Sequence, residues 1–120
     1  MARLDPLAHL PLTPVVLHIL MALTAGERHG YAIAREVEAS SDGQVRAGPG
    51  TLYGSIQRML TASLIEEAAA KRHPEPGDER RRYYRITPFG RRVLDLELQR
   101  LVDVVRIARE KCLIAEPKTA

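Results

Sequence analysis

The residues best suited to binding chemistry lie in one short stretch, GPGTLYGSIQRML, at residues 48–60. Its apolar side chains recur at helical spacing, so they predict a helix with one buried stripe. Those apolar positions are Leu52, Ile56, Met59 and Leu60. The rest of the stretch carries hydrogen-bond donors and one cation but no acid. Its glycines would let a large ligand approach the helix backbone. These properties favour a helix that binds a polyanion.

Basic residues gather further along the chain. Residues 71–92 hold eight Lys or Arg side chains against three Asp or Glu, whereas the whole chain has a net charge of only +3. This local excess favours contact with nucleic acid more strongly than the overall charge does. A solvated, charged loop is the alternative interpretation.

Catalytic and metal-binding patterns are weak. The candidates for a hydrolytic triad, Ser63, His73 and Asp78, fall on separate predicted turns, with no nucleophile elbow or phosphate-binding loop. We therefore expect no enzyme activity and no cofactor. No Cys/His pair has the spacing of a zinc site, although a metal site shared across a dimer stays open. The single cysteine, Cys112, cannot form an internal disulfide, and we expect it to act as a small apolar side chain rather than a redox sensor.

Length and composition indicate one ordinary globular domain. The chain has 120 residues, of which 45% are hydrophobic and 28% are charged. The start of the chain does not resemble a secretory leader, and its apolar runs are too short to span a bilayer. We expect a cytoplasmic protein that does not contact membranes.

The predicted elements begin with an arm or short helix at residues 1–12. Thr13 and Pro14 then form a cap and first turn for a helix that Gly26 ends. A second helix follows over residues 29–40, and the glycine-rich stretch forms the third, after an extended piece around Val45. Residues 64–69 and 81–87 predict two strands of a hairpin with a charged tip.

Thr87 and Pro88 repeat the cap-and-proline pattern and predict a long helix that continues to about Ala115. Apolar residues on it recur with a seven-residue period, which is typical of a helix that pairs with another copy of itself. The predicted dimer interface comprises Leu94, Leu98, Leu101, Val105, Ala108 and Cys112. A lid over the other helices of the same chain is the alternative.

Four segments, taken in this order, resemble the PadR family of transcriptional regulators. They are HGYAI at residues 29–33, GPGTLYGSIQRML at 48–60, SLI at 63–65 and RRYYRITPFG at 81–90, within a resemblance over residues 13–112. The resemblance implies a mainly helical protein with a winged helix-turn-helix, a two-stranded wing and a long C-terminal dimerisation helix. Together with the predicted elements, we expect an arm at 1–12, a winged helix-turn-helix DNA-binding domain at 13–87, a C-terminal dimerisation helix at 88–115 and a frayed tail at 116–120.

The function that the resemblance implies is a homodimeric regulator, expected to be a repressor, that binds double-stranded DNA at a pseudo-palindromic promoter element. A small-molecule effector is a further possible partner. The alternative is a winged-helix module that binds proteins without specific DNA binding. The third helix and the wing are expected to supply most DNA contacts, and the full set is His29, Tyr31, Gly50, Thr51, Tyr53, Gly54, Ser55, Gln57, Arg58, Lys71, Arg72, Arg80, Arg81 and Arg82.

Overall fold

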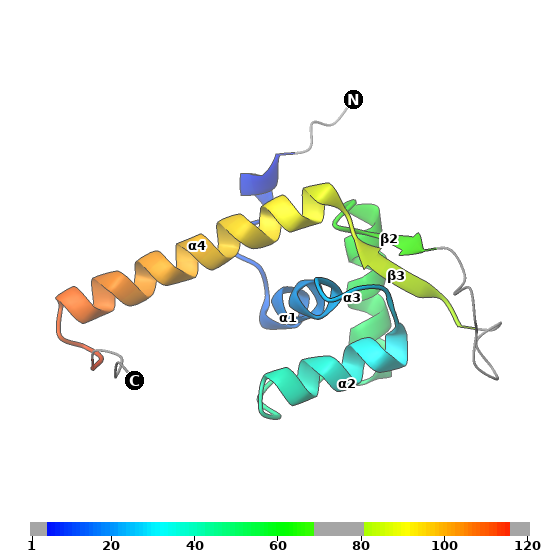
Figure 1. Ribbon diagram of the computed structural model, residues 1–120, viewed down its shortest axis with the longest axis horizontal. Helices are drawn as coiled ribbons and strands as arrows, with labels where there is room; N and C mark the ends of the chain where they lie inside the picture. Colours follow the sequence, from blue (N-terminus) through cyan, green and yellow to red (C-terminus); the bar gives the residue numbers. More distant parts are fainter. Residues whose placement is uncertain (1–4, 69–80, 116–120) are drawn as a thin grey trace.

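The computed structural model describes residues 5–68 and 81–115 and contains four α-helices, a short 3-10 helix and three strands (Figure 1). In chain order the elements are η1 (Pro6–His9), α1 (Pro14–Leu23), β1 (Arg28–His29), α2 (Gly30–Ser40), α3 (Pro49–Thr61), β2 (Ile65–Ala68), β3 (Tyr83–Ile86) and α4 (Pro88–Glu110). This mainly helical order confirms the elements expected from the sequence, with the differences described below.

The two threonine–proline pairs start helices as predicted. The Thr13 hydroxyl oxygen accepts a hydrogen bond from the Val16 N–H at 3.3 Å, and the Thr87 hydroxyl accepts one from the Gly90 N–H at 2.8 Å. Each threonine thus satisfies an N–H that has no partner within its helix. Proline follows at the first helical position, where its missing N–H costs nothing.

The hydrophobic core surrounds α1, which lies in the middle of the body (Figure 1). Branched aliphatic residues dominate it, as expected for a chain with no tryptophan and one phenylalanine. α1 supplies Ile19, Leu20 and Leu23, and side chains from the other three α-helices and from β2 and β3 pack around them. One further core residue, Leu64, lies directly before β2. The other buried core residues are Ile33, Val37, Leu52, Ile56, Met59, Ile65, Tyr84, Val93 and Leu94.

The sheet is antiparallel with strand order β1-β3-β2. The hairpin of β2 and β3 is confirmed, with Glu66 opposite Arg85 and Glu67 opposite Tyr84. The third strand, β1, was not predicted, and the extended piece expected around Val45 forms no strand. β3 is also shorter than predicted, and β2 begins at Ile65, one residue later than predicted.

The start of α4 is packed closely against the end of the segment that precedes β2. A Cβ atom placed on Gly90 would lie 2.0 Å from the backbone oxygen of Leu64. The Thr87 hydroxyl also donates a hydrogen bond to the Ser63 carbonyl oxygen at 2.6 Å. These contacts anchor the start of α4 against the body.

α4 then projects well beyond the body (Figure 1). It ends at Glu110 rather than near Ala115 as predicted, because the chain turns into a left-handed conformation at Cys112, where φ is 59°. The Leu113 N–H donates back to the Ala108 carbonyl at 2.9 Å, which is a common way to close a helix.

Candidate nucleic-acid interface

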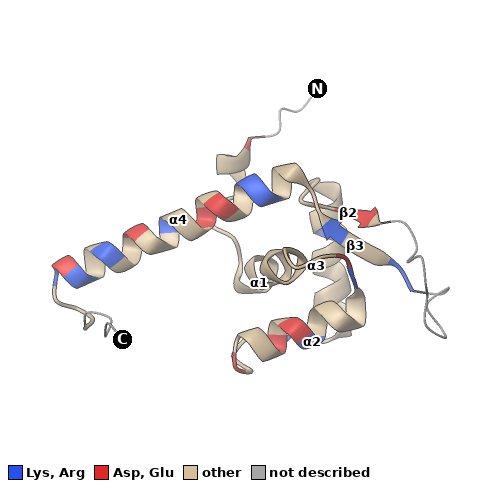
Figure 2. Cartoon of the chain, viewed as in Figure 1, with Lys and Arg blue, Asp and Glu red and all other residues tan. Residues whose placement is uncertain are grey.

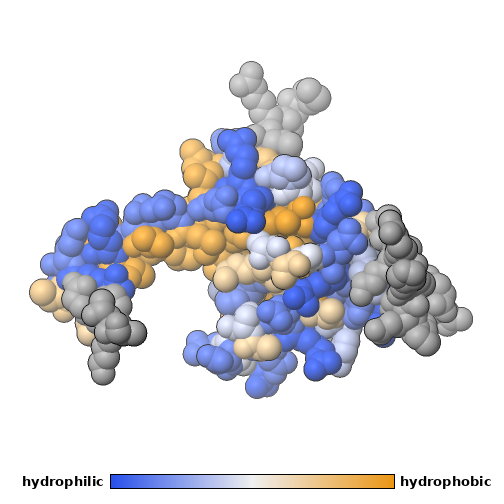
Figure 3. All heavy atoms as spheres, viewed as in Figure 1, coloured by the Kyte–Doolittle hydropathy of each residue, from blue (hydrophilic) through white to orange (hydrophobic). Residues whose placement is uncertain are grey.

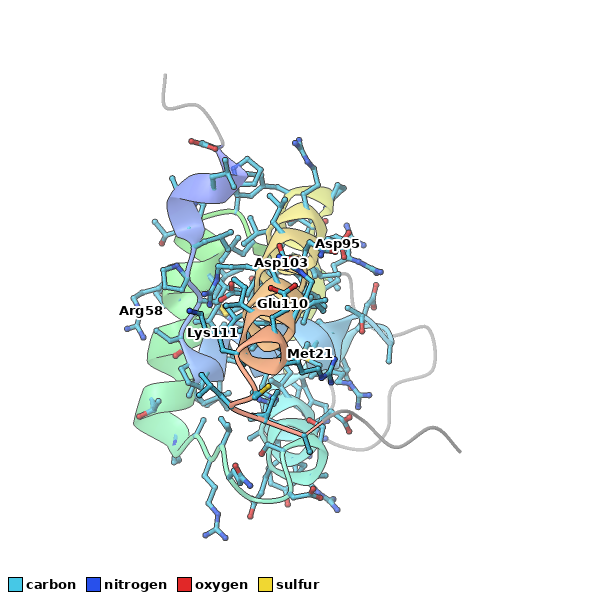
Figure 4. All side chains as sticks on the ribbon, turned by 90° about the vertical axis from the view of Figure 1, so that its left-hand side faces the viewer. Met21, Arg58, Asp95, Asp103, Glu110 and Lys111 are labelled. Carbon is cyan, nitrogen blue, oxygen red and sulfur yellow. The ribbon has the colours of Figure 1, made fainter. Side chains whose placement is uncertain are left out.

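α3 presents one face to the core and the other to solvent. Leu52, Ile56 and Met59 are buried, as their spacing predicted. Because these residues lie on one side of the helix, the opposite side is open. Figure 4 shows Arg58 projecting from α3 to the outside of the molecule.

Glycines occupy the centre of this open face. Gly50, Gly54 and Gln57 lie on the side of α3 opposite the buried residues. A Cβ atom on Gly50 would meet no atom within 4 Å, and one on Gly54 would meet only the Arg58 guanidinium at 3.5 Å. The protomer therefore has room for a side chain at both positions. A glycine inside a helix costs about 0.8–1.0 kcal/mol relative to alanine, so the open space suits a ligand that comes close to the backbone.

Polar side chains flank the two glycines. Tyr53 is 51% exposed on one side, and Arg58 is exposed on the other, as is Thr51 nearer the start of the helix. Ser55, a predicted DNA contact, is only 2% exposed. Its hydroxyl accepts a hydrogen bond from the Arg58 guanidinium at 3.3 Å. We correct its predicted role accordingly, because a buried hydroxyl can orient Arg58 but cannot reach a large ligand.

A cavity of about 280 Å³ lies where α2, α3 and β3 meet. Aromatic and cationic side chains surround it, and they come from segments far apart in the sequence. Its lining residues are His29, Gly30, Tyr31, Tyr53, Arg81, Arg82 and Tyr84. The structure therefore brings together five of the predicted contact residues around one cavity.

His29 is oriented by α2. Its Nδ1 accepts a hydrogen bond from the Ala32 N–H at 3.1 Å and so caps the helix. The other ring nitrogen, Nε2, lies 3.0 Å from the Arg81 guanidinium. Arg81 carries a positive charge and has only hydrogen-bond donors, so this edge of the cavity suits an anion.

Gly30 was not predicted as a functional residue, yet it leaves room for the Tyr53 side chain to lie against α2. A Cβ atom at Gly30 would fall 2.6 Å from the Tyr53 hydroxyl oxygen and 2.9 Å from two ring atoms. A glycine between two predicted contact residues, His29 and Tyr31, could have indicated a close approach at this position. Only the fold shows that the approaching side chain comes from α3.

Acidic residues accompany the arginines of the wing strands (Figure 2). The Arg85 guanidinium donates to the Glu66 carboxylate at 2.6 Å and lies 3.7 Å from that of Glu27. The hydrogen bond from Arg85 to Glu66, followed by their attraction, raises the pKa of Arg85. Arg82 lies 3.8 Å from Glu67. Arg85 is thus neutralised locally, and Arg82 shares its charge with one acid.

Burial raises the pKa of the Tyr84 hydroxyl, and the Glu67 carboxylate raises it further. Tyr84 therefore stays a neutral hydrogen-bonding group beside the cavity at neutral pH.

Three predicted wing contacts, Lys71, Arg72 and Arg80, lie outside the described residues.

Sequence comparison identifies the family. A sequence model of the transcriptional regulator PadR-like family matches residues 19–96, which include the whole of α3 and both wing strands. The chain belongs to the PadR-like family of transcriptional regulators. The members of this family regulate transcription and are not enzymes.

Solved PadR structures share this fold. A PadR family transcription regulator from Clostridium difficile superposes with a TM-score of 0.67 at 22% identity, over 83% of this chain and 99% of that one. A PadR-like transcriptional regulator from Bacillus cereus gives a TM-score of 0.64 at 25% identity, over 85% of this chain and 93% of that one. The architecture is therefore the winged helix with a long C-terminal helix that the resemblance implied.

A further relative is an uncharacterized 37.1 kDa protein in a transposon of Streptomyces fradiae, which is 37% identical over 79 residues. The match covers 66% of this chain and 20% of that protein. The PadR-like chain thus spans about a fifth of the length of this relative.

The C-terminal helix of this PadR-like protein carries exposed apolar side chains along its outer half (Figure 3). Val102 and Val104 are 59% and 50% exposed, and Val105 and Ile107 are also exposed. Among the residues of the predicted seam, Leu94 is only 2% exposed and belongs to the core of its own protomer. Cys112 lies past the end of the helix. The part of the seam open to a partner therefore begins near Leu98 and Leu101.

The described part of the chain has neither a cluster of metal ligands nor a membrane-spanning helix. No group of three or more His, Cys, Asp or Glu side chains at residues 5–68 and 81–115 could hold a metal ion. In the same segments, no helix has the length and apolar character needed to cross a bilayer.

Proposed function

We propose that this PadR-like chain is a homodimeric repressor that binds a pseudo-palindromic promoter element. The observation that carries this proposal is the open face of α3, which combines two glycines with free space, polar flanking side chains and no acid. Transcriptional regulators of this family bind DNA and commonly act as dimers.

The geometry of α3 suits insertion into a major groove. Gly50 and Thr51 lie in its first turn, where unpaired N–H groups and the helix dipole favour a phosphate. Gln57 and Arg58 lie farther along the exposed face and can reach base edges or phosphates. The cavity formed with His29 and Arg81 lies beside this face and would receive the DNA backbone that borders the groove.

Dimer formation through α4 supports binding of two half-sites. A second copy would cover the apolar side chains of the outer half of α4, which the protomer leaves in solvent. A pair related by two-fold symmetry presents two α3 helices to one duplex. A dimer bound to a promoter in this way represses transcription by blocking the DNA, and it needs no additional surface for contacting other proteins. A small-molecule effector that changed the angle between the two units would regulate such a dimer.

The competing function is a winged-helix module that binds another protein. The salt dependence of the binding affinity distinguishes the two functions. Binding that depends on phosphate contacts weakens steeply as salt increases, with a log–log slope of several units. A protein interface has no comparable counterion release.

The experiment is a gel shift with the DNA upstream of the protein's own reading frame, repeated over a series of salt concentrations. Arg58→Ala and Arg81→Ala should each weaken binding by about 5- to 150-fold, and loss of a phosphate contact should reduce the salt slope by about one. Arg106→Ala is the matched control, because Arg106 is an exposed arginine on the outer half of α4. Unchanged affinity in both interface variants would refute the assignment of the DNA-binding surface.

A further inference from the structure

Glu97 is a buried acid that the DNA-binding surface does not use. Its side chain is 1% exposed, although it lies on α4, a helix rich in charged residues that face solvent. It is the last buried residue of α4, since no later residue of this helix is buried. Glu97 therefore marks the point at which α4 leaves the body.

The carboxylate joins two parts of the chain. One oxygen accepts a hydrogen bond from the Leu12 N–H at 2.7 Å. The other accepts one from the Arg100 Nε at 2.5 Å, and the Arg100 Nη2 lies 3.3 Å from the first oxygen. Arg100 thus holds the carboxylate in one orientation, and the carboxylate holds Leu12.

Leu12 directly precedes the cap of α1, the helix at the centre of the core. The hydrogen bond therefore connects α4 to the body that carries α3. A second contact lies nearer the start of α4, where the rings of His9 and Phe89 meet edge to face at 5.4 Å. Between these two points, the N-terminal segment is fastened along the first turns of α4.

Beyond Glu97, α4 has no buried residue, although Leu98 is partly buried and still packs against the core. Residues 98–110 form the remaining helical arm, which is about 20 Å long at about 1.5 Å per residue. In a dimer joined through these arms, a tilt at Glu97 turns each body, with its α3, about that point, so the separation of the two α3 helices changes on both sides of the symmetry axis at once. Adjacent base pairs are only about 3.4 Å apart, so the half-site spacing that fits the dimer depends on this angle.

We propose that Glu97, through its bond to Leu12, is a positioning residue that sets the half-site spacing recognised by the dimer. This inference rests on the proposed function, because it requires a dimer joined through α4 that binds two half-sites. Burial of a carboxylate is costly and is often replaceable by an apolar side chain. Here the charge provides a fixed direction for the arm rather than contact with DNA.

The test uses the full chain and a DNA half-site first obtained by selection with the wild type from a random duplex library. Inverted repeats of that half-site are then built with spacers lengthened one base pair at a time, and binding is measured for each spacer. The variants are Glu97→Met, which removes the acceptor for Leu12, and Glu97→Gln, which loses the charged fork with Arg100. Glu110→Gln is the matched control, because Glu110 pairs with Arg106 on the same helix but is 61% exposed.

The wild type and Glu110→Gln should prefer one spacer over its neighbours by about tenfold or more, the scale of one mismatched base pair. Glu97→Met should lose that preference or shift it by a base pair while keeping the same half-site sequence and remaining dimeric. Glu97→Gln should show a smaller change in the same direction. A wild-type spacer profile in either folded variant would overturn the inference. If the wild type selects no DNA, the proposed function itself fails, so the two failures are distinguishable.

Discussion

Replacing Gly54 by alanine should make the protein more stable and a poorer DNA binder. Gly54 lies inside α3, where glycine is less favourable than alanine by about 0.8–1.0 kcal/mol. The added Cβ would approach only the Arg58 guanidinium, at 3.5 Å, which is an ordinary contact. For a chain of 120 residues, this gain corresponds to a rise in Tm of about 3–4 °C.

The same methyl group would stand between the helix backbone and the DNA. If the backbone of α3 enters the groove closely at Gly54, we expect overpacking to cost about 1–3 kcal/mol of binding free energy. That cost corresponds to a loss of affinity of about 5- to 150-fold. Thermal unfolding followed by circular dichroism and fluorescence anisotropy with a labelled duplex measure the two effects separately.

Ala39→Gly provides the control for helix propensity. Ala39 is exposed near the end of α2, away from the open face of α3, so this variant should lower the Tm and leave DNA affinity unchanged. A Gly54→Ala protein that melts higher but binds DNA as tightly as the wild type would refute close approach of the DNA to this backbone.

Three further predictions concern α4. Gly90→Ala should destabilise the fold by about 3 kcal/mol or more, because its Cβ would lie 2.0 Å from the Leu64 backbone oxygen; urea unfolding measures this, and a change under about 1 kcal/mol would contradict it. The hydrogen bond from Arg100 lowers the pKa of Glu97; burial opposes this shift, and the hydrogen bond from the Leu12 N–H adds to it. The ionised Glu97 therefore stabilises the fold above the unfolded pKa of about 4.3, and this stabilisation is lost as pH falls through the lower pKa of the folded state. Glu97→Gln should therefore flatten the acid side of a stability–pH curve from urea unfolding, and an equally steep curve would show that Glu97 contributes nothing there. Val104→Glu, at a half-exposed position on α4, should weaken self-association at least about tenfold in sedimentation while leaving the circular dichroism spectrum unchanged; a variant as dimeric as the wild type would exclude this face from the interface.

Local signals in the sequence were sufficient for much of the fold. The Thr13 and Thr87 caps, the buried stripe of α3 and the β2–β3 hairpin follow from spacing and capping chemistry between near neighbours. Such patterns act within a few residues, so they can be recognised without knowing the tertiary structure.

Features that depend on contacts between distant segments were missed. β1 has only two residues, too few for a periodic pattern, and it exists because Arg28 and His29 pair with β3. Ser55 looked like an available donor because its neighbours on α3 are polar, but its helical position turns it toward the core. The end of α4 was placed too late because apolar residues continue beyond Glu110, although the backbone turns there.

The candidate nucleic-acid interface could be predicted only in part, because it too depends on contacts between distant segments. Residue types identified the polar face of α3, and they predicted a basic wing, most of which lies outside the described residues. They could not show that Gly30 accommodates Tyr53, or that His29 and Arg81 meet across 52 residues of sequence. These contacts arise only when α2, α3 and β3 pack together.

The most direct test of the account is the number of chains bound to one selected duplex, measured by sedimentation velocity at low salt. We expect two chains on a duplex with an inverted repeat, and much weaker binding to a duplex that retains only one half-site. One chain per duplex with equal affinity for the single half-site, or no binding to any selected duplex, would contradict a dimer that binds DNA through paired α3 helices.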